Sequence, residues 1–146
     1  MPTLIDTNIL LRSIQPEHPM HLSAVRALET LMKKEETLVV ALQNIAEFWN
    51  AATRPANNNG LGLTIQEAQA ELAKIGSFFQ ILTENAASYS AWKKPLTAQR
   101  VSGVQAHDAR IASVTETYGV KRIVTFNVAD FARYPNVEVV HPEKIA

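Results

Sequence analysis

The stretch TLIDTNILL, residues 3–11, decides the fold. Its first three residues are apolar or β-branched, which is typical of a short buried strand. Asp6 then interrupts the apolar run, Thr7 and Asn8 follow, and the chain becomes apolar again at residues 9–11. A carboxylate at the end of a buried strand is either a helix cap or turn former, or a functional group at the edge of a sheet.

Strands and helices alternate along the rest of the chain. Strand patterns cover residues 38–42, 79–82, 123–126 and 137–140, and helix patterns cover residues 20–34, 43–53, 65–79, 86–94 and 106–118. The segment LVVAL, residues 38–42, is a continuous apolar run, as expected of a strand buried on both faces of a parallel sheet. Thr64 and Glu67 have the spacing of a capping box, and Gly119 stands where a helix C-cap is expected. The alternation predicts an α/β fold with a mainly parallel sheet.

The composition limits the classes of function. The length of 146 residues suits one domain, and 47% hydrophobic and 19% charged residues are typical of a globular protein. Lys and Arg number 14, as do Asp and Glu, so bulk charge does not predict nucleic-acid binding. The lack of cysteine excludes disulfides and thiolate metal sites. We expect a cytoplasmic protein, since the sequence shows no secretory signal pattern and no apolar run of about 18 residues.

Four acids lie near the ends of predicted strands or at the start of a predicted helix. Asp6 follows the first strand, Glu47 lies about one turn into the helix after the second, and Asp130 follows the fourth. Asp108 begins a helix of small and apolar residues. Taken singly, each acid also fits an ordinary role as a cap, a solvated helix residue or a partner of the helix dipole. Because the carboxyl ends of parallel strands meet at one edge, we expect these acids to gather there.

Carboxylates gathered at one edge require a compensating charge. Two unit charges about 4 Å apart cost about 4 kcal/mol at an effective dielectric constant near 20. Either the pKa values of the acids rise or a cation lies among them. Carboxylate oxygens, with no cysteine and few histidines, suit Mg²⁺ or Mn²⁺ rather than zinc.

Four segments together resemble the signature segments of PIN-domain ribonucleases. They are LIDTNILL (4–11), NIAEFW (44–49), AHDARIAS (106–113) and IVTFNVADF (123–131). The sequence is most similar to the VapC-like toxins of bacterial and archaeal toxin–antitoxin pairs, over residues 3–142. The resemblance implies a three-layer α/β/α sandwich, a single PIN-like nuclease domain over residues 1–146, and endoribonuclease activity that depends on Mg²⁺ or Mn²⁺. It also implies an RNA substrate, a cognate antitoxin and a homodimer.

The resemblance assigns roles to the acids. Asp6, Glu47 and Asp108 match the three main acids of the family, which implies that they are metal ligands and catalytic residues. At the fourth position some members carry Asp where this chain has Asn127, and others carry Asn there and an acid three residues later, as Asp130 is here. We therefore place Asp130 among the catalytic residues, and Asn127 beside it.

Further residues are candidates for contacts to RNA. Thr7 and Asn8 can hydrogen-bond a phosphate or hold Asp6, and Arg110 follows Asp108 by two residues. Asn127, Thr7, Asn8 and Arg110 are the predicted substrate-binding residues. Trp49 and Trp92 are candidates to stack on bases. For an antitoxin, the sequence offers the apolar surface near residues 22–32 and Phe48–Trp49.

Two other functional classes remain open. The first is a catalytically weak binding module with the same fold, because Asn127 adds no negative charge. The second is a phosphoacceptor or phosphatase in which a strand-end Asp is phosphorylated. Haloacid-dehalogenase-type enzymes need a second Asp two residues after the first, and Asn8 stands there, which counts against this class.

Overall fold

One parallel sheet organises residues 2–145, which are the residues that the computed structural model describes. Its five strands have the order β3-β2-β1-β4-β5. The strands are β1 Pro2–Ile5, β2 Thr37–Ala41, β3 Gln80–Leu82, β4 Arg122–Val124 and β5 Glu138–Val140. The central strand β1 pairs with β2 through Leu4 and Val39, and with β4 through Leu4 and Ile123. Every strand therefore presents its carboxyl end at the same edge.

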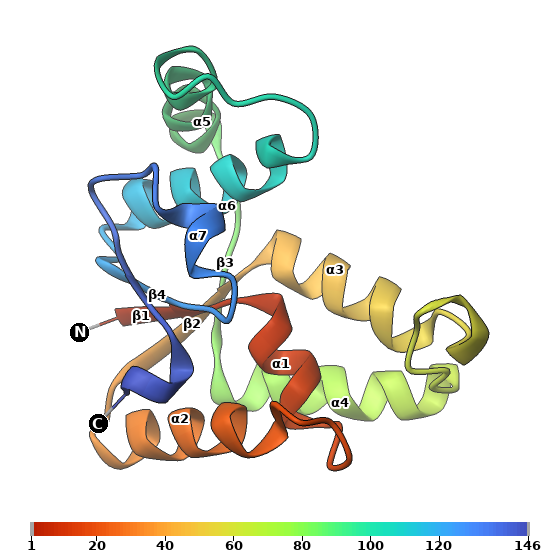
Figure 1. Cartoon of the computed structure of the whole chain (residues 1–146). Coiled ribbons are helices and arrows are strands. Elements are labelled where there is room, and N and C mark those ends of the chain that lie inside the picture. The colour runs from red at the N-terminus through yellow and green to blue at the C-terminus, as the bar shows by residue number, and fades with distance from the viewer. Residues whose placement is uncertain (1, 146) are drawn as a thin grey trace.

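Helices cover both faces of this sheet (Figure 1). The helices described are α1 Thr7–Ser13, α2 His21–Lys33, α3 Leu42–Thr53, α4 Ile65–Phe78, α5 Ala86–Ala98, α6 Gln105–Tyr118 and α7 Val128–Phe131. Two short 3₁₀ turns, η1 Ala56–Asn58 and η2 Pro142–Lys144, follow α3 and β5. Helices α1 to α4 pack on one face, α6 and α7 pack on the other, and α5 lies over α6. The predicted α/β fold and three-layer α/β/α sandwich are confirmed.

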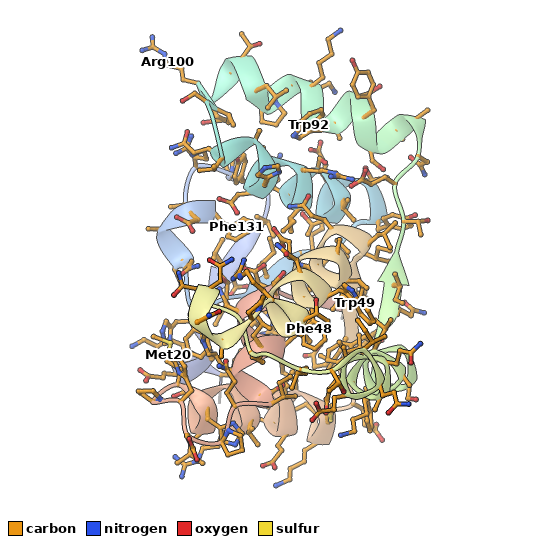
Figure 2. All side chains as sticks on the ribbon, turned by 90° about the vertical axis from the view of Figure 1, so that its right-hand side faces the viewer. Met20, Phe48, Trp49, Trp92, Arg100 and Phe131 are labelled. Carbon is orange, nitrogen blue, oxygen red and sulfur yellow. The ribbon has the colours of Figure 1, made fainter. Side chains whose placement is uncertain are left out.

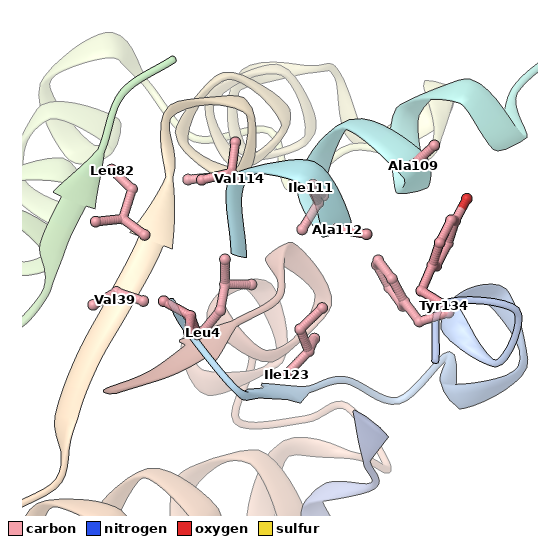
Figure 3. Close-up of a cluster of buried hydrophobic side chains, with 12 residues drawn as sticks. Leu4, Val39, Leu82, Ala109, Ile111, Ala112, Val114, Ile123 and Tyr134 are labelled. Carbon is pink, nitrogen blue, oxygen red and sulfur yellow. The ribbon is translucent and has the colours of Figure 1, made fainter. Parts of the chain in front are cut away.

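Successive strand residues supply the two cores, because side chains along a strand alternate between faces. Leu4, Val39 and Ile123 pack against α6 and α7 (Figure 3). Their neighbours face the opposite layer, against α1 to α4, and are Ile5, Val40 and Val124. Burying an aliphatic side chain contributes about 1.5–3 kcal/mol, so the central strands hold both helical layers in place.

The chain reverses its direction of winding beside β1. From β1 it moves outward to β2 and β3, and after β3 it crosses to β4 on the other side of β1. Open α/β sheets bind ligands at such a reversal, outside the carboxyl ends of the strands. Asp6 and Thr125 lie there, each directly after its strand.

The helix boundaries differ from the predicted ones in α5. The sequence pattern ends this helix at Lys94, before Pro95, whereas α5 continues through Pro95 to Ala98. The capping box of α4 is confirmed, since Thr64 Oγ1 accepts from the Glu67 N–H at 3.1 Å and the Thr64 N–H donates to Glu67 Oε1 at 2.9 Å. The helices of residues 2–145 include none that has the length and apolar run to cross a membrane.

Candidate active site

Asp6 is a buried carboxylate that follows β1 and caps α1. Its Oδ1 accepts from the Thr7 N–H at 2.9 Å and from Asn44 Nδ2 at 3.2 Å. Its Oδ2 accepts from Thr125 Oγ1 at 2.7 Å and from Asn8 Nδ2 at 3.5 Å. The side chain is only 7% exposed. The helix-cap reading and the functional reading of Asp6 are thus compatible, because the same carboxylate caps α1 and faces the pocket described below.

Asn44 connects Asp6 to Glu47. It is fully buried in the first turn of α3, and its Oδ1 accepts from the Ala41 N–H at 2.9 Å. Its Nδ2 donates to Asp6 and, at 3.0 Å, to Thr7 Oγ1. Thr7 Oγ1 in turn donates to Glu47 Oε1 at 2.7 Å. A continuous hydrogen-bonded chain therefore fixes the two carboxylates relative to each other.

Thr125 and Asn8 hold Asp6 from the side of β4. The Thr125 side chain is fully buried, and its Oγ1 accepts from Asn8 Nδ2 at 3.1 Å and from the Asn127 N–H at 3.0 Å. Asn8 Oδ1 accepts from the Phe126 N–H at 3.2 Å. These bonds join the start of α1 to the turn after β4, 117 to 119 residues along the chain.

Asp6, Glu47 and Asp108 line one open pocket of about 320 Å³, which we call the acid pocket. Its other lining residues are Thr7, Asn8, Leu11, Asn50, Ala51, Arg54, Ile111 and Asn127. Four segments contribute, namely the turn after β1 with α1, helix α3, helix α6 and the turn after β4. Three of the predicted acids thus come together although 102 residues separate the first from the last.

Burial and neighbouring negative charges raise the pKa values of Asp6 and Asp108. Burial raises the pKa of Asp108 to about 6, and the charges of Asp130, Asp6 and Glu47 contribute to the increase. Burial also raises the pKa of Asp6, with the charges of Glu47 and Asp130 adding to it and the hydrogen bonds from Thr125 and Thr7 opposing it. The site holds more negative charge than its surroundings neutralise.

The remaining predicted residues lie at different distances from this centre. Asp130 is exposed on α7 and does not line the acid pocket, but its charge acts on both Asp6 and Asp108. Asn127 is exposed and lines the pocket. Arg110 lies outside it and forms two hydrogen bonds to Glu84, at 2.5 and 3.0 Å. Arg54, in contrast, lines the acid pocket beside the carboxylates.

The donor set fits a hard divalent cation held largely by water. Within residues 2–145, no three Asp, Glu or His side chains are arranged, as they stand, to grip one ion. Mg²⁺ usually keeps several waters and binds through one or two carboxylates and a substrate phosphate. Each carboxylate oxygen of Asp6 already accepts two hydrogen bonds, so a bound ion would share one of these oxygens with its donors. The longest and weakest of the four hydrogen bonds is the 3.5 Å one from Asn8 Nδ2 to Oδ2. The pocket therefore fits a partly hydrated ion rather than a closed protein cage.

Comparisons with known proteins agree with this architecture. The PIN domain family profile matches residues 3–137. The fold is similar to VapBC2 from Rickettsia felis bound to a promoter DNA fragment, at 21% identity and a TM-score of 0.72, with 97% of this chain and 98% of that chain covered. It is similar to a toxin–antitoxin complex from Klebsiella pneumoniae, at 21% identity and a TM-score of 0.66, with 96% and 97% covered. It is also similar to VapC20, a sarcin–ricin loop cleaving toxin from Mycobacterium tuberculosis, at 18% identity and a TM-score of 0.68, with 94% and 98% covered. No curated protein matches the sequence.

The family match extends over nearly the whole described chain. The chain therefore belongs to the PIN domain family. At these identities the structural likenesses establish the fold. The resemblance drawn from the four signature segments is confirmed at the level of this family.

Proposed function

We propose that this protein is a divalent-metal-dependent endoribonuclease and the toxin of a toxin–antitoxin pair. The observation that carries the proposal is the convergence of Asp6, Glu47 and Asp108 in one pocket, at the reversal point of the sheet, with the pKa of Asp108 raised to about 6. The PIN family is a ribonuclease family in general, and the Klebsiella and Mycobacterium neighbours are a toxin–antitoxin complex and an RNA-loop cleaving toxin.

Each acid has a separate task in this proposal. Asp6 and Asp108 hold the cation from the two helical layers, and Glu47 completes the site from α3. Asp130, at the rim, adds negative charge and orients water. When bound, Mg²⁺ or Mn²⁺ lowers the pKa of an attacking water and neutralises charge on the phosphate.

The polar residues around the acids bind the substrate. Thr7 keeps Glu47 in place through its 2.7 Å hydrogen bond, while Asn8 and Asn127 offer amide donors to phosphate oxygens. Arg54 supplies a positive charge beside the pocket. Arg110 is held by Glu84, so its contribution to phosphate binding is smaller than its position next to Asp108 suggests.

RNA cleavage with and without Mn²⁺ tests the proposal. The wild-type chain is expected to cleave a mixed single- and double-stranded RNA only when Mn²⁺ or Mg²⁺ is present. Asp6→Asn should reduce the rate at least 100-fold, because it removes a charge at the centre of the site. Glu116→Gln, an exposed acid farther along α6, should cleave at the wild-type rate. Equal cleavage by wild type and Asp6→Asn, after purification from contaminating nucleases, would refute the assignment.

One observation favours a second function, that of a binding module with little catalytic activity. As the side chains stand in residues 2–145, no three acids grip a single ion. A binding module would bind RNA or protein without cleaving any RNA in Mn²⁺. The phosphoacceptor alternative is disfavoured, because phosphorylation needs a free and accessible carboxylate oxygen. Each Asp6 oxygen already accepts two hydrogen bonds, and the side chain is 7% exposed.

The proposed partners are an antitoxin, a second copy of this chain and RNA, in the cytoplasm. Met20, Leu22 and Met32, at and within α2, expose 43%, 59% and 40% of their surface, which offers apolar area to an antitoxin. Phe48 does not contribute to such a surface, because it is 1% exposed in the core under α3, and that part of the sequence expectation is wrong. A protein encoded by a neighbouring reading frame should co-purify with the chain and lose affinity for Leu22→Asp.

A further inference from the structure

A second cavity lies on the other side of α6 from the acid pocket. It has a volume of about 420 Å³ and opens between α5 and α6. Tyr89 and Trp92 line it from α5, His107 and Arg110 line it from α6, and Glu84 lies at its rim. We call it the aromatic cavity. Its volume is within the range of small-ligand sites. Of the residues given roles above, Arg110 and Trp92 line it.

Helix α6 is the wall that the two cavities share. Each residue turns an α-helix by about 100°, so neighbouring residues face different sides. His107 and Arg110 face the aromatic cavity, whereas Asp108 and Ile111 face the acid pocket. Gln43 ties α3 to the start of this helix, since its Nε2 donates to the His107 carbonyl at 3.0 Å and lies 3.4 Å from Glu47 Oε2. An RNA strand bound at the acids would reach the aromatic cavity by passing over α6.

The aromatic side chains are held ready for a flat ligand. Trp92 is fixed between α5 and α6 by a 2.9 Å hydrogen bond from its Nε1 to the Ala106 carbonyl (Figure 2). Tyr89 lies beside it, with ring centroids 6.4 Å apart and ring planes at 53°, and is 60% exposed. The two hydrogen bonds from Arg110 to Glu84 fix the plane of the guanidinium group, and the Glu84 carboxylate offsets its positive charge. Aromatic and guanidinium faces of this kind stack on unpaired bases, whereas phosphates need unneutralised cations.

We infer that the aromatic cavity is a base-binding subsite for the nucleotide next to the phosphodiester at the acid pocket. The inference rests on the proposed ribonuclease function and adds a second point of contact with the substrate. Bases in a duplex are stacked on one another and cannot enter a cavity walled by aromatic rings. The nucleotide that fills the subsite is therefore an unpaired one. Stacking tolerates all four bases, so the subsite selects strandedness more than sequence.

Binding of a labelled RNA tests the subsite separately from cleavage. The probe is a fluorescein-labelled single-stranded oligoribonucleotide, measured by fluorescence anisotropy in the Asp6→Asn background so that it stays intact. Adding Tyr89→Ala should raise the Kd about fivefold or more, as expected for the loss of one base–aromatic stack. Tyr89→Phe should restore the affinity, because it keeps the ring.

Phe78→Ala is the matched control. Phe78 is 62% exposed, close to the 60% of Tyr89, but it precedes β3 and so lies toward the amino edge of the sheet. This variant should bind the probe as the background does. In an otherwise wild-type chain, Tyr89→Ala should raise KM for RNA cleavage more than it lowers kcat.

Each outcome separates the two claims. If wild type cleaves RNA while Tyr89→Ala binds the probe as tightly as Phe78→Ala, the subsite is refuted and the ribonuclease stands. A Tyr89→Ala effect of equal size on a fully duplex RNA probe also refutes the subsite. If the wild-type chain cleaves no RNA in Mn²⁺ and does not bind the probe, the proposed function fails and the subsite with it.

Discussion

Asn44 fixes the spacing of the acid pocket without exposing any surface of its own. Its three hydrogen bonds reach the Ala41 N–H, Asp6 and Thr7. Without the Asn44 side chain, the buried Ala41 N–H has no acceptor and Thr7, which holds Glu47, loses a hydrogen bond. Asn44 is therefore a positioning residue for two carboxylates.

Asn44→Ala should lower the free energy of unfolding by about 1–3 kcal/mol, because an unsatisfied buried donor has about that cost. It should also weaken Mn²⁺ binding, measured by calorimetry, in the fraction of the chain that stays folded. Asn50→Ala, an exposed asparagine on the same helix, should change the stability by less than about 0.5 kcal/mol. Equal urea midpoints for the two variants would contradict this role.

Asp108 should titrate near pH 6 in the metal-free protein. Burial and the charges of Asp130, Asp6 and Glu47 raise its pKa to about 6 from the ordinary value of 3.8. Its contribution to stability is fully present below the unfolded pKa of about 3.8 and is lost as pH rises through about 6. A carbon-detected NMR titration of the carboxyl group should show this midpoint, and Asp130→Asn should lower it. Since the ion needs the carboxylate, Mn²⁺ affinity should fall below pH 6.

The sequence identifies residues whose roles follow from their place next to a strand or at the start of a helix. It does not identify residues whose role depends on a hydrogen-bond partner far along the chain. Asp6, Glu47 and Asp108 stand out because each follows a strand or begins a small-residue helix. Asn44 looks like an ordinary residue of a first turn, and its bond to Asp6 spans 38 residues. The ion pair of Arg110 with Glu84 is 26 residues apart and equally invisible. The catalytic and metal-binding roles of the acids stay predictions.

The loop between α3 and α4 shapes the rim of the acid pocket by close backbone approach. A Cβ added to Gly60 would lie 1.9 Å from the Arg54 carbonyl oxygen, so no side chain fits there. The Gly62 N–H also donates to that carbonyl, at 2.9 Å, which folds the loop back onto the residue that lines the pocket. The loop therefore positions Arg54.

Gly60→Ala should lower the free energy of unfolding by about 2 kcal/mol or more, since the backbone has to move apart. It should also weaken RNA binding by displacing Arg54. Gly76→Ala is the matched control, because nothing lies within 4 Å of its added Cβ within α4. That change should stabilise the protein by about 0.5–1 kcal/mol, as glycine is a poor helix former. Urea unfolding should show a lower free energy of unfolding for Gly60→Ala and a higher one for Gly76→Ala than for the wild type.

Long elements follow from sequence patterns more reliably than short ones. The five strands and the helices α2, α3, α4 and α6 follow from apolar runs and caps. Helices α1 and α7, of seven and four residues, are too short for a helical period and form because tertiary contacts hold them. Helix α5 continues through Pro95, although proline removes one backbone hydrogen bond and crowds the carbonyl four residues earlier. The packing of Trp92 and Leu96 against the core offsets this cost.

Across the whole molecule, bound metal should add stability. A ligand that binds only the folded state contributes RT ln(1 + [L]/Kd), about 2.7 kcal/mol at a hundredfold excess over Kd. For a chain of this size, that corresponds to an increase of roughly 5–10 °C in Tm. Mn²⁺ should produce this increase in the wild type and in Glu116→Gln, but not in Asp6→Asn. An equal increase in Asp6→Asn would show that the ion binds elsewhere.

The bond from Thr125 to Asp6 has a consequence for how the protein is made. Residue 6 leaves the ribosome early, but its carboxylate lacks this clamp, and β1 lacks its second neighbour β4, until residues 122–125 have emerged. Asp108 also joins late, on α6. Translation is thus nearly finished before the acid pocket can be complete, so any activity that depends on this pocket begins only with the finished chain.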